Sequence, residues 1–269
     1  MSERRGTVPD FRLDGQVALV IGGTSGIGKA IAMGYAGSGA RVIVSGRNAA
    51  KMEAALAEIR AHGEGHGYAA DVADPDELRG LVGIALAHHG RIDTLVNCQG
   101  MTTLKPAEEF TAADWDEIVG INLRSVFFAC TEVGRHMLGR GRGAIVNIGS
   151  LASYRGWPRS AIYGITKAAV VNLTESLAIE WAGRGVRVNA ILPAQVVNPG
   201  LEQRMNENPA LRDKFLSGIP AGRLGQSDDI RGLAVFLASD ASSWITGTLI
   251  PMDGGNLAAN AGATMGRRG

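Results

Sequence analysis

The stretch VALVIGGTSGIG at residues 17–28 decides the fold. An apolar run from Val17 to Ile21 ends in glycines, and a helical pattern follows from Ile27 to Ala36. A short β-branched run is typical of a fully buried strand. Backbone N–H groups in a glycine-rich turn can approach a pyrophosphate, and the helix N-terminus adds a partial positive charge. The stretch therefore predicts a first strand, a first helix and a phosphate site between them.

The rest of the chain alternates short apolar runs with helical patterns. Further strands are expected at 41–45, 68–70, 94–96, 144–148, 186–191 and 249–252, and further helices at 48–62, from 75 onward, and at 114–138 and 161–182. This alternation predicts βαβ units, and hence a doubly wound parallel sheet with helices on both faces. Such sheets bind ligands at the carboxyl ends of their strands.

Length and composition favour one α/β domain over residues 1–269. Apolar residues make up 45% of the chain and charged residues 20%, as in ordinary globular proteins. We expect a loose polar tail at 1–13. Residues 193–220 contain the breakers Pro199, Gly200 and Pro209, and long excursions of this kind are often lids over substrates.

The charge and cysteine content exclude several classes of protein. A formal net charge of +1 offers no basic stripe for nucleic acid. No run of 18 apolar residues predicts a membrane span, and the polar N-terminus shows no signal region. Cys98 and Cys130 are far apart and lack metal-ligand spacing, so we expect free thiols, no metal site and a cytoplasmic location.

The end of the second expected strand bears on the choice of cofactor. It reads Ser45-Gly46-Arg47-Asn48, without the acid that usually holds the ribose 2′-hydroxyl of NAD. Arg47 offers a planar fork suited to a 2′-phosphate, although it is also compatible with a solvated surface arginine. We therefore favour NADP(H), with NAD(H) possible.

Two further strand ends add cofactor candidates. Asp71 follows the third strand and could accept from an adenine amino group, or it could cap the next helix, a role that suits Asp74 better. Residues Asn97 to Gly100 follow the fourth strand, where cofactor-facing loops belong, but a simple turn would also fit.

Four polar residues suggest proton chemistry. Tyr163 and Lys167 share a helix face, and a nearby ammonium is one way to stabilise a tyrosinate whose ordinary pKa is about 10. Ser150 ends the fifth strand, where its hydroxyl could hold a substrate oxygen. Asn122 stands in an apolar helical stretch, which is locally unfavourable. Singly, each has an ordinary explanation as surface packing, a cap or a kinked backbone.

Together these residues resemble the short-chain dehydrogenase/reductase family, in its compact single-domain branch. The resemblance runs from about Leu13 to Gly255, and it includes a late D-G-G element at 253–255. The glycine turn is similar to the family's T-G-x-x-x-G-I-G signature. The order and spacing of its catalytic tetrad match Asn122, Ser150, Tyr163 and Lys167.

The resemblance implies a Rossmann-type sheet of seven strands, usually in a homotetramer. It implies that Tyr163 is the general acid/base, that Lys167 lowers its pKa and binds the nicotinamide ribose, that Ser150 orients the substrate oxygen and that Asn122 holds a water of the proton relay. With it, the expected cofactor contacts are Gly22, Thr24, Ser25, Gly26, Ile27, Gly28, Arg47, Asn48, Asp71, Val72, Asn97, Gly100, Tyr163, Lys167, Pro193 and Val196.

Three departures from the family pattern concern the cofactor site. Ile21 replaces the usual threonine before Gly22. The loop at 97–100 reads N-C-Q-G in place of N-N-A-G. Pro193 is followed by Ala194 in place of glycine. These changes affect fine cofactor geometry and remove no member of the tetrad.

The substrate is left open by the sequence. Expected contacts are Ser150, Ala152, Tyr163 and Gln195, with a lid that carries Met205, Phe215 and Leu216. This mixture admits sugars or polyols as well as cyclic or acyl ketones. The leading hypothesis is an NADP(H)-preferring oxidoreductase that interconverts a carbonyl and a secondary alcohol. Alternatives are an NAD(H)-dependent sugar or polyol dehydrogenase, a non-catalytic nucleotide-binding regulatory protein, and an isomerase or dehydratase that uses the same tyrosine.

Overall fold

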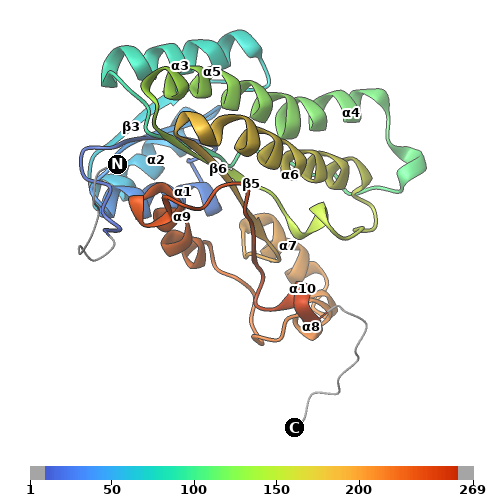
Figure 1. Ribbon diagram of the computed structural model, residues 1–269. Helices are drawn as coiled ribbons and strands as arrows, with labels where there is room; N and C mark the ends of the chain where they lie inside the picture. The colour runs from blue at the N-terminus through green and yellow to red at the C-terminus, as the bar shows by residue number, and fades with distance from the viewer. Residues whose placement is uncertain (1–9, 260–269) are drawn as a thin grey trace.

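The computed structural model describes residues 10–259 and contains a parallel sheet at its centre (Figure 1). The strand order is β3-β2-β1-β4-β5-β6-β7, and every pairing is parallel. The strands are β1 (Val17–Ile21), β2 (Arg41–Gly46), β3 (Gly65–Ala69), β4 (Thr94–Asn97), β5 (Gly143–Ile148), β6 (Val186–Pro193) and β7 (Leu249–Met252). The doubly wound, seven-stranded fold predicted from the sequence is confirmed.

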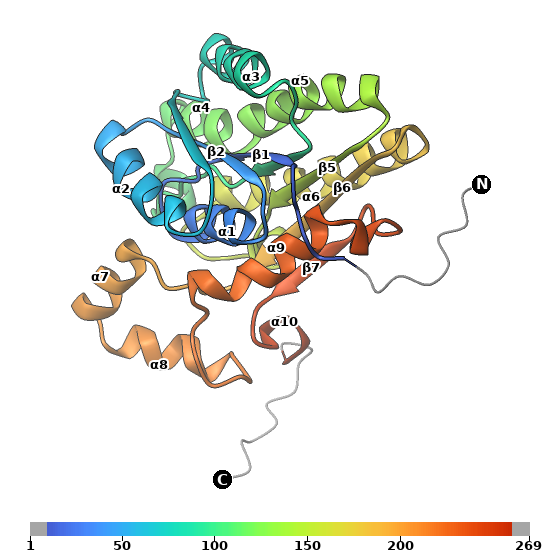
Figure 2. The same cartoon turned by 90° about the vertical axis from the view of Figure 1, so that its left-hand side faces the viewer.

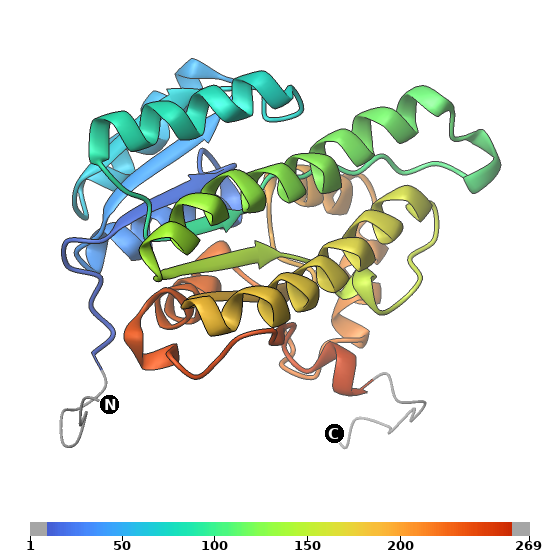
Figure 3. The same cartoon turned by 45° about the horizontal axis from the view of Figure 1, so that its top comes forward.

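Helices cover both faces of the sheet. They are α1 (Gly26–Gly37), α2 (Ala49–Arg60), α3 (Pro75–His89), α4 (Ala112–Val119), α5 (Ser125–Arg140), α6 (Ala161–Trp181), α7 (Pro199–Glu207), α8 (Ala210–Ser217), α9 (Arg231–Ala238) and α10 (Asn256–Ala259). Figure 2 shows α3 and α5 on one side of the sheet and α1 and α9 on the other. In Figure 3, α5 and α6 run side by side across the first of these faces.

Side-chain alternation along β1 explains the two cores. Leu19 and Ile21 pack with α3, α5 and α6, whereas Ala18 and Val20 pack with α1, α2 and α9. Because successive strand residues point to opposite faces, a continuous apolar strand supplies both cores at once. Because packed helices cover both faces of the sheet, the site must lie at one of its two edges, where the strands begin or end.

The third strand begins earlier than the sequence indicates. We predicted 68–70, whereas β3 runs over Gly65–Ala69. A Cβ at Gly67 would stand 2.8 Å from atoms of Met52 and Leu56 on α2, so glycine lets this helix pack closely on the strand. Glycine has low strand propensity, which hid these positions from a pattern based on apolar residues.

The helix predicted over 114–138 is interrupted. Thr111 caps α4 in a capping box with Asp114, and a five-residue π-helix, η2 (Gly120–Arg124), separates α4 from α5. Single π-turns inside helices occur frequently at functional sites. Asn122 lies in this turn and is fully buried.

Two segments outside the sheet carry more structure than the sequence indicates. The excursion at 193–220 forms α7 and α8, which pack around Leu201, Phe215 and Ile219. Of the expected tail, residues 1–9 lie outside the described part. Leu13 is buried, and its N–H donates to the Ser38 carbonyl at 2.8 Å, so the chain is packed on the fold just before β1.

Candidate active site

A cleft of about 570 Å³ opens over the carboxyl ends of the strands. It lies beside the neighbouring strands β1 and β4, between which the strand order reverses. Open α/β sheets usually bind their ligands at this position. Most of the sequence-predicted site residues line it: Gly22, Thr24, Ser25, Gly26, Ile27, Gly28, Arg47, Asp71, Val72, Gly100, Ser150, Tyr163, Lys167, Pro193 and Val196. The structure thus brings residues from most of the chain into one hollow.

The glycine turn has the shape that a pyrophosphate needs. At Gly22, φ is +78°, and a Cβ would stand 2.8 Å from the Gln99 nitrogen. A Cβ at Gly28 would stand 2.2 Å from the Gly22 carbonyl oxygen. Both positions therefore require glycine for close backbone packing.

Gly26 is different, because it faces open space. Its φ is +49°, and a Cβ would meet no atom within 4 Å. Ser25, the N-cap of α1, makes no side-chain cap bond, so its side chain satisfies none of the first N–H groups of that helix, and the Gly28 N–H bonds to Cys98. These features fit a dinucleotide, which Gly22 to Gly28 would hold by its phosphates.

The end of β2 places Arg47 and Asp71 opposite each other. Arg47 Nη1 lies 3.8 Å from Asp71 Oδ2, and both side chains are exposed at the mouth of the cleft. Asp74 caps α3, with its Oδ1 2.8 Å from the Asp76 nitrogen, so Asp71 does not serve as that cap. Asp71 Oδ1 also accepts from the Ala73 N–H at 3.1 Å, and both Arg47 and Asp71 line the cleft at the end of the sheet where cofactor contacts were expected.

Tyr163 and Lys167 lie on the first turns of α6. Lys167 Nζ donates to the Ile148 carbonyl at 2.7 Å and lies 5.8 Å from the centroid of the Tyr163 ring. Burial lowers the pKa of Lys167 to about 8. The ammonium is thus held against the end of β5, close to the phenol.

Burial raises the pKa of Tyr163, and a hydrogen bond with Ser150 acts in the opposite direction. The Ser150 hydroxyl also accepts from the Ala152 N–H at 3.1 Å. Ser150 and Tyr163 are thus in contact, with both hydroxyls at the cleft. Two hydroxyls arranged in this way could bind one substrate oxygen between them.

Asn122 lies behind this pair, under the wall of the cleft. Its Oδ1 accepts from the Met101 N–H at 2.8 Å, and its Nδ2 donates to the Met101 carbonyl at 2.9 Å. Nδ2 also lies 3.2 Å from Thr166 Oγ1, on the same helix as Tyr163. Asn122 therefore joins the π-turn, the loop after β4 and α6.

Four other predicted contacts lie apart from the wall of the cleft. Asn97 is buried under it and donates to Asn147 Oδ1 at 2.9 Å. Asn48 caps α2 by accepting from the Lys51 N–H at 2.9 Å. Ala152 contributes its N–H to Ser150, and Gln195 lines a smaller cleft of about 180 Å³ beside Gly254. Their roles as ligand contacts stay predictions.

Sequence reasoning named the loop at 97–100 without singling out Cys98 or Gln99 as contacts, and it missed Met101, although all three line the cleft. Gln99 is the most informative, because it is buried and its Oε1 has no hydrogen-bond partner. The departure from the N-N-A-G pattern was the signal that could have identified it.

The segment expected to form a lid, residues 193–220, contains α7 and α8. The rings of Trp157 and Phe215 lie 6.0 Å apart, and Phe215, on α8, is buried, whereas Met205 and Leu216 are partly buried against the same cluster. Val197 and Asn198, just before α7, line the cleft. The chain just before α7 therefore reaches the cleft, and the role of residues 193–220 as a lid stays a prediction.

Comparison with known proteins agrees with this geometry. A family model described as enoyl-(acyl carrier protein) reductase matches residues 22–256. The chain belongs to the short-chain dehydrogenase/reductase family. It is 44% identical to D-threitol dehydrogenase of Mycolicibacterium smegmatis, over 91% of this chain and 94% of that protein. It is 40% identical to galactitol 2-dehydrogenase (L-tagatose-forming) of Cereibacter sphaeroides, over 91% and 96%.

A solved structure of this family is also similar. A putative NAD(P)-dependent gluconate 5-dehydrogenase from Beutenbergia cavernae, with bound NADP, has a TM-score of 0.88 and 40% identity, covering 93% of this chain and 99% of that one. The chain is thus an NAD(P)-dependent oxidoreductase of carbonyl and alcohol groups, as the sequence predicted. Among residues 10–259, no helix is long and apolar enough to cross a membrane.

Proposed function

We propose that this enzyme interconverts a secondary alcohol and a carbonyl on a polyol or sugar-like molecule, with NADP(H) preferred and Tyr163 as general acid/base. The observation that carries the proposal is the meeting of Ser150, Tyr163 and Lys167 at the carboxyl edge, beside an open phosphate turn. The substrate class is supported by the relatives named for threitol and galactitol. NAD(H) use on the same substrates is the alternative.

Each residue has a role that its position supports. The bound nicotinamide would accept or donate the hydride. In the oxidative direction, the Tyr163 oxygen takes the proton from the alcohol, and in reduction it returns that proton to the carbonyl oxygen. The Ser150 hydroxyl holds the same oxygen in place, and the Lys167 ammonium favours the phenolate, because a positive charge stabilises a nearby anion.

Replacing the Tyr163 hydroxyl tests this assignment. We expect Tyr163→Phe to lower kcat by roughly a thousandfold, within the usual range for a general acid/base. Turnover is followed by nicotinamide absorbance on a panel of polyols, sugars and ketones, with both cofactors. Tyr68→Phe on β3, away from the cleft, is the matched control and should retain activity. Unchanged turnover in Tyr163→Phe would refute the role.

The same panel separates the other hypotheses. Cofactor binding without turnover on any substrate would favour a nucleotide-binding regulatory protein. Product formation without net consumption of cofactor would favour an isomerase or dehydratase. The intact set of Asn122, Ser150, Tyr163 and Lys167 supports the dehydrogenase over both.

The preference for NADP(H) rests on Arg47, whose guanidinium stands at the mouth of the cleft. We expect Arg47→Asp to lower the ratio of kcat/KM for NADPH over NADH by about tenfold or more, since a charge-assisted hydrogen bond is replaced by repulsion. Arg79→Asp, on the outer surface of α3, is the control. An unchanged ratio in Arg47→Asp would refute the role of Arg47 in the choice of cofactor.

We also propose a homotetramer, as the family resemblance implies. The helices α4, α5 and α6 expose large apolar side chains, namely Trp115, Phe127, Phe128, Ile165 and Ile179. Exposed apolar groups gathered on neighbouring helices are typical of an interface. Light scattering coupled to gel filtration gives the mass in solution, and a monomeric mass would contradict the proposal. A cytoplasmic location stays a prediction.

A further inference from the structure

Gln99 is a buried amide at the floor of the cleft, in the loop where the family pattern has alanine. Its Nε2 donates to Ser125 Oγ at 3.0 Å and lies 3.4 Å from Asn97 Oδ1. The side chain therefore connects the loop after β4 to the first residue of α5.

The connection continues into the π-turn. Ser125 Oγ donates to the Ile121 carbonyl at 2.5 Å, and the Ser125 N–H bonds to the Gly120 carbonyl. In a π-turn the backbone leaves the regular helical ladder, so carbonyls there depend on other donors. Gln99 thus fixes the serine that braces the residue just before Asn122.

The same loop has a second tether two residues later. Asn122 binds both the N–H and the carbonyl of Met101, at 2.8 and 2.9 Å. Gly100 lies between the two tethers, and a Cβ there would stand 3.5 Å from Asn122 Oδ1 and 3.6 Å from Lys167 Nζ. The loop is therefore clamped on both sides of the point where it meets Lys167.

The unpaired Oε1 of Gln99 indicates that packing alone does not explain an amide at this position. A buried amide oxygen without a donor is destabilising, and alanine would avoid that cost. Buried polar groups that break the rule of full pairing concentrate at functional sites. The stabilising contact of the amide is the hydrogen bond from Nε2 to Ser125.

We propose that Gln99 is a positioning residue for catalysis, which holds the loop and the π-turn so that Asn122 and Lys167 keep their alignment with Tyr163. The inference rests on the proposed proton chemistry of Tyr163. Gln99 acts through Ser125 and does not itself touch the reacting atoms.

The decisive experiment compares two substitutions at Gln99. Gln99→Ala removes the amide and its volume, and Gln99→Met keeps the length without a donor. Because small misplacements of catalytic groups are expensive, we expect kcat to fall by roughly tenfold in both, with a much smaller change in the KM for cofactor. The apparent pKa of the kcat–pH profile should rise in both, because the phenolate of Tyr163 is less well stabilised.

Ser125→Ala extends the test along the bridge. It should reproduce the loss of kcat, and the double variant Gln99→Ala/Ser125→Ala should be little worse than either single variant, because residues in one network are not additive. Gln16→Ala, at the opposite edge of the sheet, is the control and should retain kcat and the pH profile.

Three results would overturn the proposal: full activity in Gln99→Met, an unchanged pH profile with lowered kcat, or additive losses in the double variant. Each is measured on folded protein, as verified by thermal unfolding. The outcome is separate from the role of Tyr163, since a Tyr163→Phe variant that remains active refutes the proton chemistry whatever Gln99 does.

Discussion

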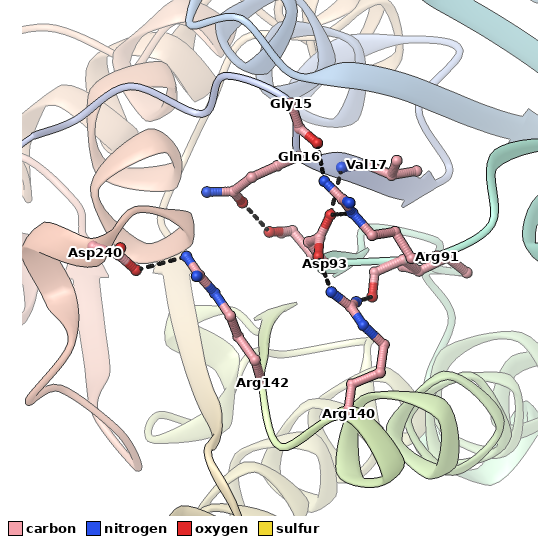
Figure 4. Close-up of polar contacts among 10 residues, drawn as sticks. Gly15, Gln16, Val17, Arg91, Asp93, Arg140, Arg142 and Asp240 are labelled. Atoms are coloured by element: carbon pink, nitrogen blue, oxygen red, sulfur yellow. Dashed lines mark hydrogen bonds and ion pairs between the residues drawn. The ribbon is translucent and has the colours of Figure 1, made fainter.

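The amino edge and the carboxyl edge of the sheet, where the strands begin and end, differ in how their buried charges are paired. At the amino edge, Asp93 accepts from the Val17 N–H and from Arg91, each at 2.8 Å, and from Arg140 at 2.9 Å (Figure 4). At the carboxyl edge, the buried Lys167 donates to a neutral carbonyl. One edge neutralises its charge within the protein, whereas the other leaves its charge for a ligand.

The pKa values express the same difference. Burial alone would raise the pKa of Asp93, but the bonds from Val17, Arg91 and Arg140 hold it below its ordinary value. Burial lowers the pKa of Lys167 to about 8 without comparable compensation. Unpaired buried oxygens on Ser45, Gln99 and Gln195 also lie toward the carboxyl edge, whereas the unpaired buried nitrogens among residues 10–259 are on His136, Arg187 and Arg231. The paired buried charge of Asp93 and the proposed catalytic residues thus lie at opposite ends of the strands.

The largest expected effect is on turnover at the carboxyl edge. Lys167→Met should lower kcat by about a thousandfold, because Tyr163 loses the cation that stabilises its phenolate. Lys51→Met on α2, which is exposed, is the control. Steady-state rates with saturating NADPH give the comparison, and equal rates in the two variants would contradict the division of roles between the edges.

The lowered pKa of Lys167 should make the stability of the fold depend on pH between about 8 and 10.5. Its folded pKa is about 8, against 10.5 for the ordinary group, so between these values the unfolded chain binds more protons at this site. The free energy of unfolding of the wild type should therefore rise relative to Lys167→Met as pH increases through that window. Urea unfolding below pH 8 and near pH 10.5 measures the difference, which should not be constant.

The second effect is on stability at the amino edge. Asp93→Asn places an N–H₂ group among donors, and we expect the free energy of unfolding to fall by roughly 2 kcal/mol, below the loss typical of a fully buried pair. Because the folded pKa of Asp93 is lowered, its contribution is present above the unfolded pKa of about 3.9 and is lost as pH falls through the folded value.

Two measurements test this second prediction. Urea unfolding near neutral pH gives the loss, and unfolding at acid pH should show wild type and variant converging. The kcat of folded Asp93→Asn should equal that of the wild type. A fall in kcat with unchanged stability would contradict the comparison, because Asp93 would then affect turnover and not stability.

The glycine turn shows what the sequence could predict and why. Gly22, Gly26 and Gly28 are set by close backbone contacts and left-handed φ values, which few other residues tolerate. The positions of Ser150, Tyr163 and Lys167 were also predicted, because Tyr163 and Lys167 are local on one helix and Ser150 follows a strand, but only the family resemblance joined them into a tetrad. Local rules and that resemblance together therefore predicted the fold and most of the residues that line the cleft.

What the sequence did not predict depends on long-range packing. The π-turn at Asn122 forms where α4 and α5 meet the loop after β4, and the asparagine in an apolar stretch was compatible with a kink without predicting a π-turn. Gln195 lines a separate cleft with Gly254, because the backbone after β6 pairs with the segment at Gly225. Both outcomes depend on partners far along the chain.

The third prediction compares two glycines to separate the loss of stability caused by backbone strain from a loss of NADPH affinity. Gly26 and Gly90 have φ values of +49° and +74°, and a Cβ at either would meet no atom within 4 Å. Substitution by alanine should cost each about 1 kcal/mol of stability. Only Gly26→Ala should weaken NADPH binding, by roughly tenfold, since its Cβ would stand where the phosphates come closest.

Fluorescence titration with NADPH and thermal unfolding of the two variants test this pair. Gly90 ends α3 at the amino edge, so Gly90→Ala controls for the backbone strain alone. Equal NADPH affinity in both variants would mean that the turn at Gly26 does not hold the cofactor.

The smallest effect compares two buried serines. Ser45 Oγ at the end of β2 has no partner, whereas Ser242 Oγ donates to the Leu237 and Ser239 carbonyls at 3.1 and 3.0 Å. Because an unpaired buried hydroxyl is unfavourable and a paired one is favourable, Ser45→Ala should raise the free energy of unfolding by up to about 1 kcal/mol, and Ser242→Ala should lower it by a similar amount. Urea unfolding of the protein without cofactor measures both changes. If Ser45→Ala is as destabilising as Ser242→Ala, the unpaired hydroxyl of Ser45 does not lower the stability of the fold. The contrast between the two edges would then rest on Lys167 alone.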